Sequence, residues 1–183
     1  MQAILLCGGK GVRLKPLTDS LPKPLIPVRG RPIVDYIVAH LEKYGVTDII
    51  VAAGYKSQEF HRHFASHRHV RVVDSGDVDI IKRLSCCAPF IQEDFLVLYG
   101  DTLSDVDLGA LITFHRARGE RVTVTAWPLR TQFGLMDLNA EGKVISFQEK
   151  PQLDKWINIG HFYFAHELLE QLENFQRFED FLC

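Results

Sequence analysis

The chain has 183 residues, of which 46% are hydrophobic and 24% are charged, and its formal net charge is -2. This composition is typical of a soluble globular protein, the length favours a single domain over residues 1–183, and the charge argues against a nucleic-acid partner. No apolar run approaches the ~20 residues needed to cross a bilayer, and the 4 cysteines lack metal-ligand spacing, so we expect a cytoplasmic protein without a membrane partner.

Short apolar runs alternate with helical patterns along the chain. In chain order the predicted elements are a strand (3–7), a glycine- and proline-rich stretch (8–32), a helix (33–41), a strand (48–53), a helix (58–65), strands (70–73 and 95–99), a helix (108–118), a strand (122–127), a hairpin (135–138 and 143–147), a strand (159–165) and a helix (166–172). This order predicts a three-layer, Rossmann-like α/β fold, in which helices cover both faces of a mostly parallel sheet and a small β excursion is inserted.

Two predicted strand-to-loop junctions carry polar residues suited to chemistry. In open parallel sheets, ligands bind outside the carboxyl ends of the strands. The loop that follows Cys7 and the pair Gly100-Asp101 both lie at such ends. We therefore expect them to share one binding site.

The first loop combines glycines with a fixed cation. Gly8, Gly9 and Gly11 follow a buried strand directly and allow the backbone N–H groups to approach phosphate oxygens, while Arg13 can grip a phosphate in bidentate fashion. The spacing matches neither a P-loop nor the dinucleotide-binding glycine pattern. A flexible strand-to-helix turn is the alternative interpretation of these glycines alone.

The second segment, Pro22-Lys23-Pro24, holds one lysine between two prolines. Proline fixes its own φ angle and restricts the residue before it, so this lysine is presented by a stiff backbone. A rigid backbone has no benefit for a lysine that only contacts solvent, whereas it helps to position a lysine that binds a phosphate. Together with the glycine loop, Lys23 indicates a phosphate-binding site.

These segments resemble the signature of the sugar-1-phosphate nucleotidyltransferases, which join a nucleoside triphosphate to a sugar 1-phosphate and release pyrophosphate. The signature runs from Gly8 to Thr18 and from Pro22 to Val28, with Val12 in place of the usual threonine. The resemblance continues through Gly30–Ile33, Tyr99–Asp101, Phe133-Gly134, Gln148–Pro151 and Asn158–Gly160, and so covers nearly the whole chain.

The resemblance implies a role for each matching position. Arg13, Lys23 and Asp101 would be catalytic, with Arg13 on the β- and γ-phosphates, Lys23 near the α-phosphate and Asp101 holding Mg²⁺. The nucleotide would be bound by Leu6, Gly8, Gly9, Gly11, Arg13, Lys23 and Gly76. The sugar phosphate would be bound by Gly134, Glu149, Lys150, Asn158 and Gly160. A homo-oligomer is also compatible with the family.

The chain departs from the family pattern at two further places. Relatives carry a glycine-rich segment that touches the base, and only Gly76 survives of it within residues 74–83. Relatives also continue into a segment whose aspartate shares the metal, and no such segment follows Phe181. The local motifs are most similar to the glucose-1-phosphate cytidylyltransferases, which suggests CTP and a hexose 1-phosphate. The alternative is a paralogue that binds nucleotide or sugar phosphate without turnover.

Several polar residues have simpler interpretations. We expect Asp107 to cap the helix that starts at residue 108, which leaves Asp101 as the metal ligand. His63 and His67 have the spacing of zinc ligands on a helix, but no acidic or cysteine partner lies nearby in the sequence, so we favour a solvated helix end. Cys7 is predicted to be a small buried residue without a chemical role.

Overall fold

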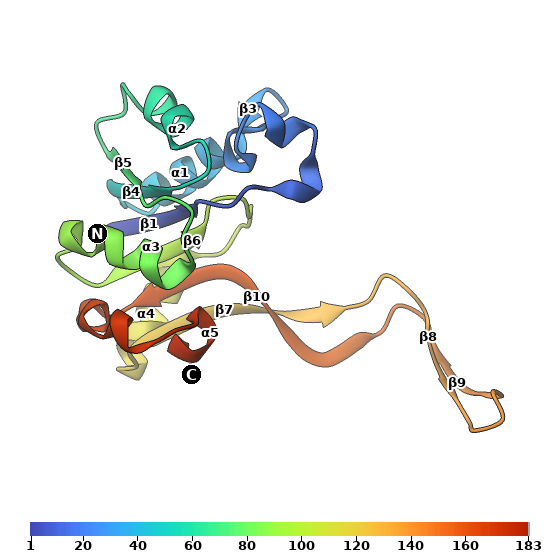
Figure 1. The fold of residues 1–183 in the computed structure, drawn as a ribbon. Coiled ribbons are helices and arrows are strands. Elements are labelled where there is room, and N and C mark those ends of the chain that lie inside the picture. The colour runs from blue at the N-terminus through green and yellow to red at the C-terminus, as the bar shows by residue number, and fades with distance from the viewer. Residues whose placement is uncertain (183) are drawn as a thin grey trace. The chain divides into compact units, whose positions relative to one another are not determined.

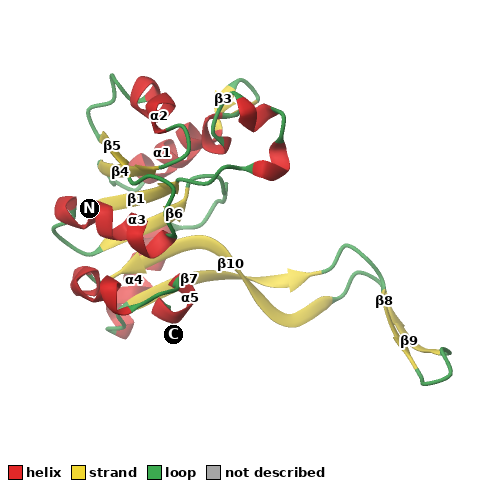
Figure 2. Cartoon of the chain, viewed as in Figure 1, coloured by secondary structure: helices red, strands yellow, loops and turns green. Residues whose placement is uncertain are grey.

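The computed structural model describes residues 1–182 of the chain, which divides into two compact units (Figures 1 and 2). Within the described residues, the first unit comprises residues 1–124 and 160–182, and the second comprises Thr125–Ile159. Among residues 1–182, no helix is both long and apolar enough to cross a membrane.

A six-stranded sheet forms the centre of the first unit, in the order β5-β4-β1-β6-β10-β7. Its strands are β1 (Gln2–Cys7), β4 (Asp48–Ala53), β5 (Val70–Asp74), β6 (Phe95–Tyr99), β7 (Val122–Arg130) and β10 (Gln152–Phe164). The four strands β5, β4, β1 and β6 are parallel, and β10 pairs antiparallel to β6. The mostly parallel sheet expected from the apolar runs is confirmed.

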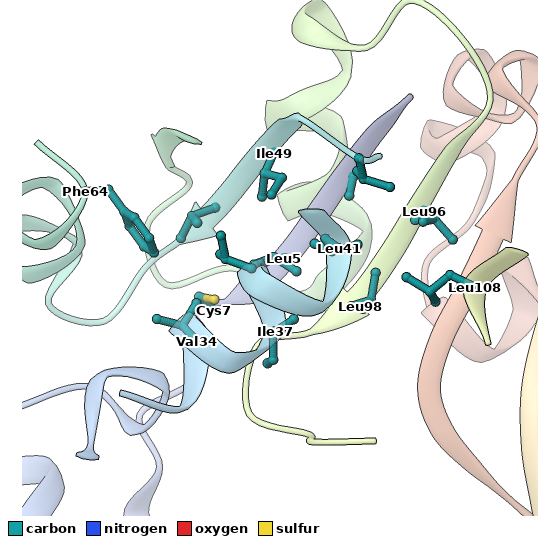
Figure 3. Packing of buried hydrophobic residues seen from close by; sticks show 14 of the residues in the cluster. Leu5, Cys7, Val34, Ile37, Leu41, Ile49, Phe64, Leu96, Leu98 and Leu108 are labelled. Atoms are coloured by element: carbon teal, nitrogen blue, oxygen red, sulfur yellow. The ribbon is translucent and has the colours of Figure 1, made fainter. Parts of the chain in front are cut away.

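Helices cover both faces of this sheet because the side chains of each strand alternate between two cores. On one face, Leu5 of β1 belongs to a core with α1 (Ile33–Lys43), α2 (Ser57–His63) and α4 (Leu108–Arg118), as Figure 3 shows in part. On the other face, Ile4 belongs to a core with α3 (Ile80–Cys87), η5 (His166–Asn174) and α5 (Phe178–Phe181). The three-layer architecture is thereby accounted for by apolar residues alone.

The segment between β1 and α1 contains three short 3-10 turns and a small hairpin. The turns are η1 (Val12–Leu14), η2 (Leu17–Asp19) and η3 (Lys23–Leu25), and β2 (Pro27–Val28) pairs with β3 (Arg31–Pro32). The prolines of this segment interrupt regular hydrogen bonding, which explains why no long element forms here.

The second unit contains the predicted hairpin, formed by β8 (Leu135–Leu138) and β9 (Val144–Gln148). Met136 lies opposite Phe147, and a register irregularity follows Asp137. The prediction of an antiparallel β excursion is confirmed.

Several elements differ from the sequence prediction, and three of them bear on the site or on the ends of the sheet. Helix α3 was not expected, although Asp79 caps it by accepting a hydrogen bond from the Lys82 backbone N–H at 2.9 Å. Strand β10 starts at Gln152, seven residues before the predicted start, and η5 is a 3-10 helix. Helix α4 starts at the predicted residue, because Asp107 accepts a hydrogen bond from the Ala110 N–H at 2.9 Å.

Candidate functional site

The candidate site lies where the strand order of the sheet reverses. From β1 the chain proceeds outward to β4 and β5, and it then returns to the other side of β1 with β6. Such a switch point leaves a crevice at the carboxyl ends of the two strands that flank it. Gly8 follows β1 and Gly100 follows β6, and the Gly100 N–H donates to the Leu6 carbonyl at 3.0 Å. The two expected loops therefore lie side by side.

The glycine loop, residues Gly8–Gly11, is held by a buried threonine. Gly11 has a φ of 60°, and a Cβ atom built on it would lie 2.9 Å from the Thr18 Cγ2 atom and 3.2 Å from the Lys23 Cβ atom. The Thr18 hydroxyl donates to the Gly11 carbonyl at 3.1 Å, and the Tyr55 hydroxyl donates to the Thr18 carbonyl at 2.9 Å. Any side chain at residue 11 would disturb this packing.

Lys23 and Asp101 form an ion pair at this edge of the sheet. The Lys23 Nζ atom lies 2.8 Å from the Asp101 Oδ2 atom, and their side chains are 33% and 37% exposed. Both belong to the first unit, although 78 positions separate them in the sequence. The structure thus brings together two of the three residues for which the sequence predicts a catalytic role.

Arg13 lies in η1, which follows the glycine loop, and its side chain is exposed. Among residues 1–182 it forms no ion pair with a carboxylate. The structure therefore leaves its guanidinium available for an anion that enters the crevice.

A cavity of about 410 Å³ opens between the glycine loop and the start of α3. Three of the predicted nucleotide-binding residues, Leu6, Gly8 and Gly9, line it together with the predicted metal ligand Asp101. The other lining residues are Lys10, Asp77, Val78, Asp79, Ile80, Arg83 and Tyr99. Gly11, Arg13, Lys23 and Gly76 are not among the residues that line this cavity.

Arg83 connects this cavity to the sheet beneath it. Its side chain is 5% exposed, and its guanidinium donates hydrogen bonds to the carbonyls of Ala53 (2.9 Å), Val78 (2.8 Å) and Gly76 (3.3 Å) and to the Ser75 hydroxyl. Burial lowers the pKa of this guanidinium below its ordinary value. Arginine nonetheless stays charged at neutral pH, so the group is a buried cation.

Gly8 makes room for this cation. A Cβ atom at residue 8 would lie 1.9 Å from the Arg83 Cζ atom, so a side chain there would collide with the guanidinium. The glycine loop therefore needs Gly8 for close packing as well as for its backbone N–H group.

Cys7 is 1% exposed, and burial raises the pKa of its thiol well above the ordinary value. Only the thiolate is nucleophilic, so we expect Cys7 to resist alkylation by iodoacetamide at pH 8, whereas the partly exposed Cys86 reacts. Peptide mapping by mass spectrometry measures both residues in one sample. Alkylation of Cys7 at the rate of Cys86 in the folded protein would contradict this expectation.

The family assignment comes from comparison with known proteins. The family model described as nucleotidyl transferase matches residues 2–182. The chain belongs to the nucleotidyl transferase family. The family resemblance drawn from the signature segments and the expectation of a nucleotidyltransferase are both confirmed.

Relatives of this nucleotidyl transferase include enzymes for different bases. The glucose-1-phosphate cytidylyltransferase of Salmonella typhimurium is 34% identical over 203 residues, which cover 95% of this chain and 79% of that enzyme. A UTP–glucose-1-phosphate uridylyltransferase of Synechocystis is 27% identical, over 98% of this chain and 53% of the relative.

Solved structures share the fold. A Bacillus anthracis protein assigned as a glucose-1-phosphate thymidylyltransferase, determined in complex with a sucrose, has a TM-score of 0.77 at 21% identity, over 100% of this chain and 78% of that chain. HddC from Yersinia pseudotuberculosis, complexed with GMP-PN, has a TM-score of 0.72 at 21% identity, over 92% of this chain and 78% of that chain. The three-layer fold of this nucleotidyl transferase is therefore that of known nucleotidyltransferase structures.

Four of the predicted sugar-phosphate residues lie in the second unit of this nucleotidyl transferase. A Cβ atom at Gly134 would lie 2.7 Å from the Phe147 Cζ atom and 3.2 Å from the Glu149 Oε2 atom. This glycine therefore packs beside Glu149, the residue that is predicted to bind the sugar. Lys150 has a φ of 45°, and its Nζ atom lies 3.9 Å from the Glu149 Oε1 atom. Asn158 belongs to β10.

Gly160, the remaining predicted sugar-phosphate residue, lies in the first unit. It has a φ of 77°, and a Cβ atom there would lie 2.3 Å from the Tyr99 Cδ2 atom. The tyrosine ring can therefore rest against the backbone of β10 only because residue 160 is glycine. Since Tyr99 lines the cavity, Gly160 shapes that wall indirectly.

The donor set at Asp101 suits a metal that is shared with a substrate. Within residues 1–182, no group of three or more His, Cys, Asp or Glu side chains could hold a metal by itself. Mg²⁺ keeps several waters and is commonly bound by one or two carboxylates plus substrate phosphates. The position beside Asp101 holds a cation, the Lys23 ammonium. A single partly exposed carboxylate at such a position fits Mg²⁺ that is shared with a substrate phosphate.

His63, the other metal candidate, has a partner that the sequence did not indicate. Its Nε2 atom lies 2.6 Å from the Asp35 Oδ1 atom, and its ring lies 6.1 Å from the ring of His67. Asp35 comes from α1, so this acidic neighbour is brought to α2 only by the fold.

Proposed function

We propose that this protein transfers the cytidylyl group of CTP to glucose 1-phosphate, which gives CDP-glucose and pyrophosphate. The observation that carries the proposal is the Lys23–Asp101 pair, 2.8 Å apart at the carboxyl edge of β1 and β6 and beside the glycine loop. The choice of CTP and glucose 1-phosphate is supported by the 34% identity to the Salmonella cytidylyltransferase over 95% of the chain.

The nucleotide would enter the cavity between the glycine loop and α3. Backbone N–H groups of Gly8, Gly9 and Gly11 are suited to phosphate oxygens, and Leu6 and Gly76 would contact the nucleoside. Arg13 would bind the β- and γ-phosphates, because its exposed guanidinium lacks a carboxylate partner among the described residues. These roles follow the family signature and are supported by the clustering of Leu6, Gly8 and Gly9 around one cavity.

In the reaction, a phosphate oxygen of glucose 1-phosphate attacks the α-phosphorus of CTP. A new P–O bond forms there as the bond to the β-phosphate oxygen breaks, and the electron pair leaves with pyrophosphate. The attacking oxygen is already anionic, so no protein group has to remove a proton. The barrier is largely the repulsion between two anions, and it is lowered by cations held in position and by in-line orientation.

Lys23 and Asp101 would have different roles at the α-phosphate. The Lys23 ammonium would leave Asp101 and stabilise the charge that develops on the α-phosphoryl oxygens. Asp101 would then hold Mg²⁺ together with phosphate oxygens of the substrate. When bound, the metal neutralises negative charge on the transferring group. Arg13 would stabilise the leaving pyrophosphate in the same way.

The family signature assigns the sugar phosphate to residues near the C-terminal end of the chain. Glu149 would accept hydrogen bonds from sugar hydroxyls and Lys150 would pair with the phosphate, while Gly134, Asn158 and Gly160 would line the sugar pocket. The proximity of Gly134 to Glu149 and the positive φ of Gly160 support this assignment.

The test is pyrophosphate release with Mg²⁺ from ATP, CTP, GTP, UTP and dTTP, each combined with several hexose and heptose 1-phosphates. We expect the highest kcat/KM with CTP and glucose 1-phosphate. Release with another pair would keep the reaction class and overturn the proposed base or sugar. Absence of release with every pair, while a triphosphate still binds, would instead favour a binding protein without turnover.

A further inference from the structure

Lys10 and Asp77 face each other across the cavity that is proposed to receive the nucleotide. Lys10 belongs to the glycine loop and Asp77 follows the turn at Gly76, and both line the cavity. The Lys10 Nζ atom lies 2.5 Å from the Asp77 Oδ2 atom, and their side chains are 55% and 75% exposed. This ion pair therefore joins the loop that would bind phosphates to the opposite wall.

The charges that line the cavity do not suit a polyphosphate as they stand. Three carboxylates, those of Asp77, Asp79 and Asp101, line it, and the cations that line it are Lys10 and Arg83. The Arg83 guanidinium already donates to three backbone carbonyls and one hydroxyl, so it is not free to turn toward a ligand. Lys10 is thus the lining cation that can move.

Two of the three carboxylates have other partners. Asp101 pairs with Lys23, and Asp79 accepts a hydrogen bond from the Lys82 N–H as the N-cap of α3. Asp77 is left as the partner of Lys10 alone among the ion pairs of the described residues. The hydrogen bond from Lys10 lowers the pKa of the Asp77 carboxyl, so both groups are ionised at neutral pH.

We propose that Lys10 is a further triphosphate-binding residue, and that Asp77 holds its ammonium across the cavity until the nucleotide displaces it. The inference rests on the proposed function, because it needs a polyphosphate ligand in this cavity. The exchange is favourable because a phosphate chain carries more negative charge than one carboxylate, whereas an exposed ion pair contributes little stability. Lysine also has a flexible stem that can reorient toward a new partner.

The exchange makes opposite predictions for the two partners. Lys10→Ala removes a contact to the phosphates, and we expect it to weaken binding about tenfold, the order expected for one hydrogen bond to a charged group. Asp77→Asn removes the competitor for Lys10 and a repulsive charge, and we expect it to tighten binding. Asp77→Asn should increase the affinity less in a protein that already carries Lys10→Ala than in the wild type.

Titration calorimetry with Mg²⁺ and inorganic tripolyphosphate measures these affinities without depending on the nucleobase or on turnover. The matched control is the exposed ion pair of Lys15 and Asp19, whose side chains are 61% and 57% exposed. The Lys15 Nζ atom lies 3.3 Å from the Asp19 Oδ1 atom, and neither residue lines the cavity. Lys15→Ala and Asp19→Asn should bind tripolyphosphate as the wild type does. The log-log dependence of affinity on salt concentration should also be shallower for Lys10→Ala than for either control, because one fewer ion contact is made.

The outcomes separate this inference from the proposed function. Wild-type binding that is unchanged by Lys10→Ala, or weakened by Asp77→Asn, would overturn the exchange and leave the proposed function standing. A wild-type protein that does not bind tripolyphosphate in the presence of Mg²⁺ would overturn the exchange, whereas the proposed function falls only if pyrophosphate release is also absent with every pair. Weaker binding by Lys10→Ala together with tighter binding by Asp77→Asn would support the exchange, since a pair with a purely structural role would lose affinity on either substitution.

Discussion

Replacement of Lys23 by alanine is expected to lower kcat/KM for nucleotidyl transfer about 100-fold, which corresponds to ~3 kcal/mol of transition-state stabilisation. Lys23 is held rigidly by Pro22 and Pro24 in η3, and its Cβ atom packs beside Gly11. Its ammonium lies 2.8 Å from Asp101, at the point where the negative charges of two phosphates would meet.

The dependence on Mg²⁺ gives this prediction a second readout. In the proposed mechanism Lys23 and Mg²⁺ would compete for Asp101, so Lys23→Ala should lower the Mg²⁺ concentration needed for half-maximal rate even though the rate itself falls. Lys15→Ala, which removes a more exposed lysine from the same segment, serves as the control and should change neither value. Retention of more than about a third of the wild-type rate by Lys23→Ala would remove Lys23 from the mechanism.

The central strands could be predicted from the sequence because they are buried on both faces. Strands β1, β4 and β6 are continuous apolar runs, a pattern that parallel strands between two helical layers require. Helix α3 was missed because it spans only 8 residues and begins with two β-branched isoleucines, which are weak helix formers. The first half of β10 was missed because its exposed residues follow no apolar alternation.

The candidate site was only partly predictable, since its parts meet through contacts between distant positions. The resemblance assigned Lys23 to the α-phosphate and Asp101 to Mg²⁺, and the structure shows the two side chains paired. The contact between Lys10 and Asp77 spans 67 positions, and Arg83 reaches Ala53 across 30 positions. Nothing in the local sequence around any of these residues indicates its partner.

The segment that follows β5 also contributes more residues to the site than the sequence predicted. The sequence suggested that only Gly76 of residues 74–83 could serve the nucleotide. In the structure, Asp77–Ile80 and Arg83 line the cavity, and Gly76 contributes its carbonyl as an acceptor for Arg83. The absence of the glycine-rich pattern therefore did not remove this wall of the cavity, because the buried Arg83 guanidinium holds the carbonyls of Gly76 and Val78.

Replacement of Arg83 by methionine is expected to lower the free energy of unfolding by about 1–3 kcal/mol. Methionine keeps an unbranched apolar stem of similar length, so the change isolates the hydrogen bonds of the guanidinium. Those bonds reach the carbonyls of Ala53, Gly76 and Val78 and the Ser75 hydroxyl, of which only Ala53 and Ser75 are buried. The Ala53 carbonyl still accepts from the Ser75 N–H, so the loss is on the order of 1–3 kcal/mol, the cost of one buried acceptor without its charged donor. Urea unfolding followed by circular dichroism measures the loss.

Lys82→Met is the matched control for Arg83→Met, because it makes the same kind of change at the preceding position of α3, where the side chain is exposed. We expect it to change the free energy of unfolding by less than about 0.5 kcal/mol. Arg83→Met should also raise the KM for CTP, because residues 75–80 lose their tie to the sheet and the cavity wall moves. If Arg83→Met is as stable as Lys82→Met, the hydrogen bonds of the guanidinium only compensate for the cost of burying its charge. The cavity wall formed by residues 75–80 would then be held by backbone contacts alone.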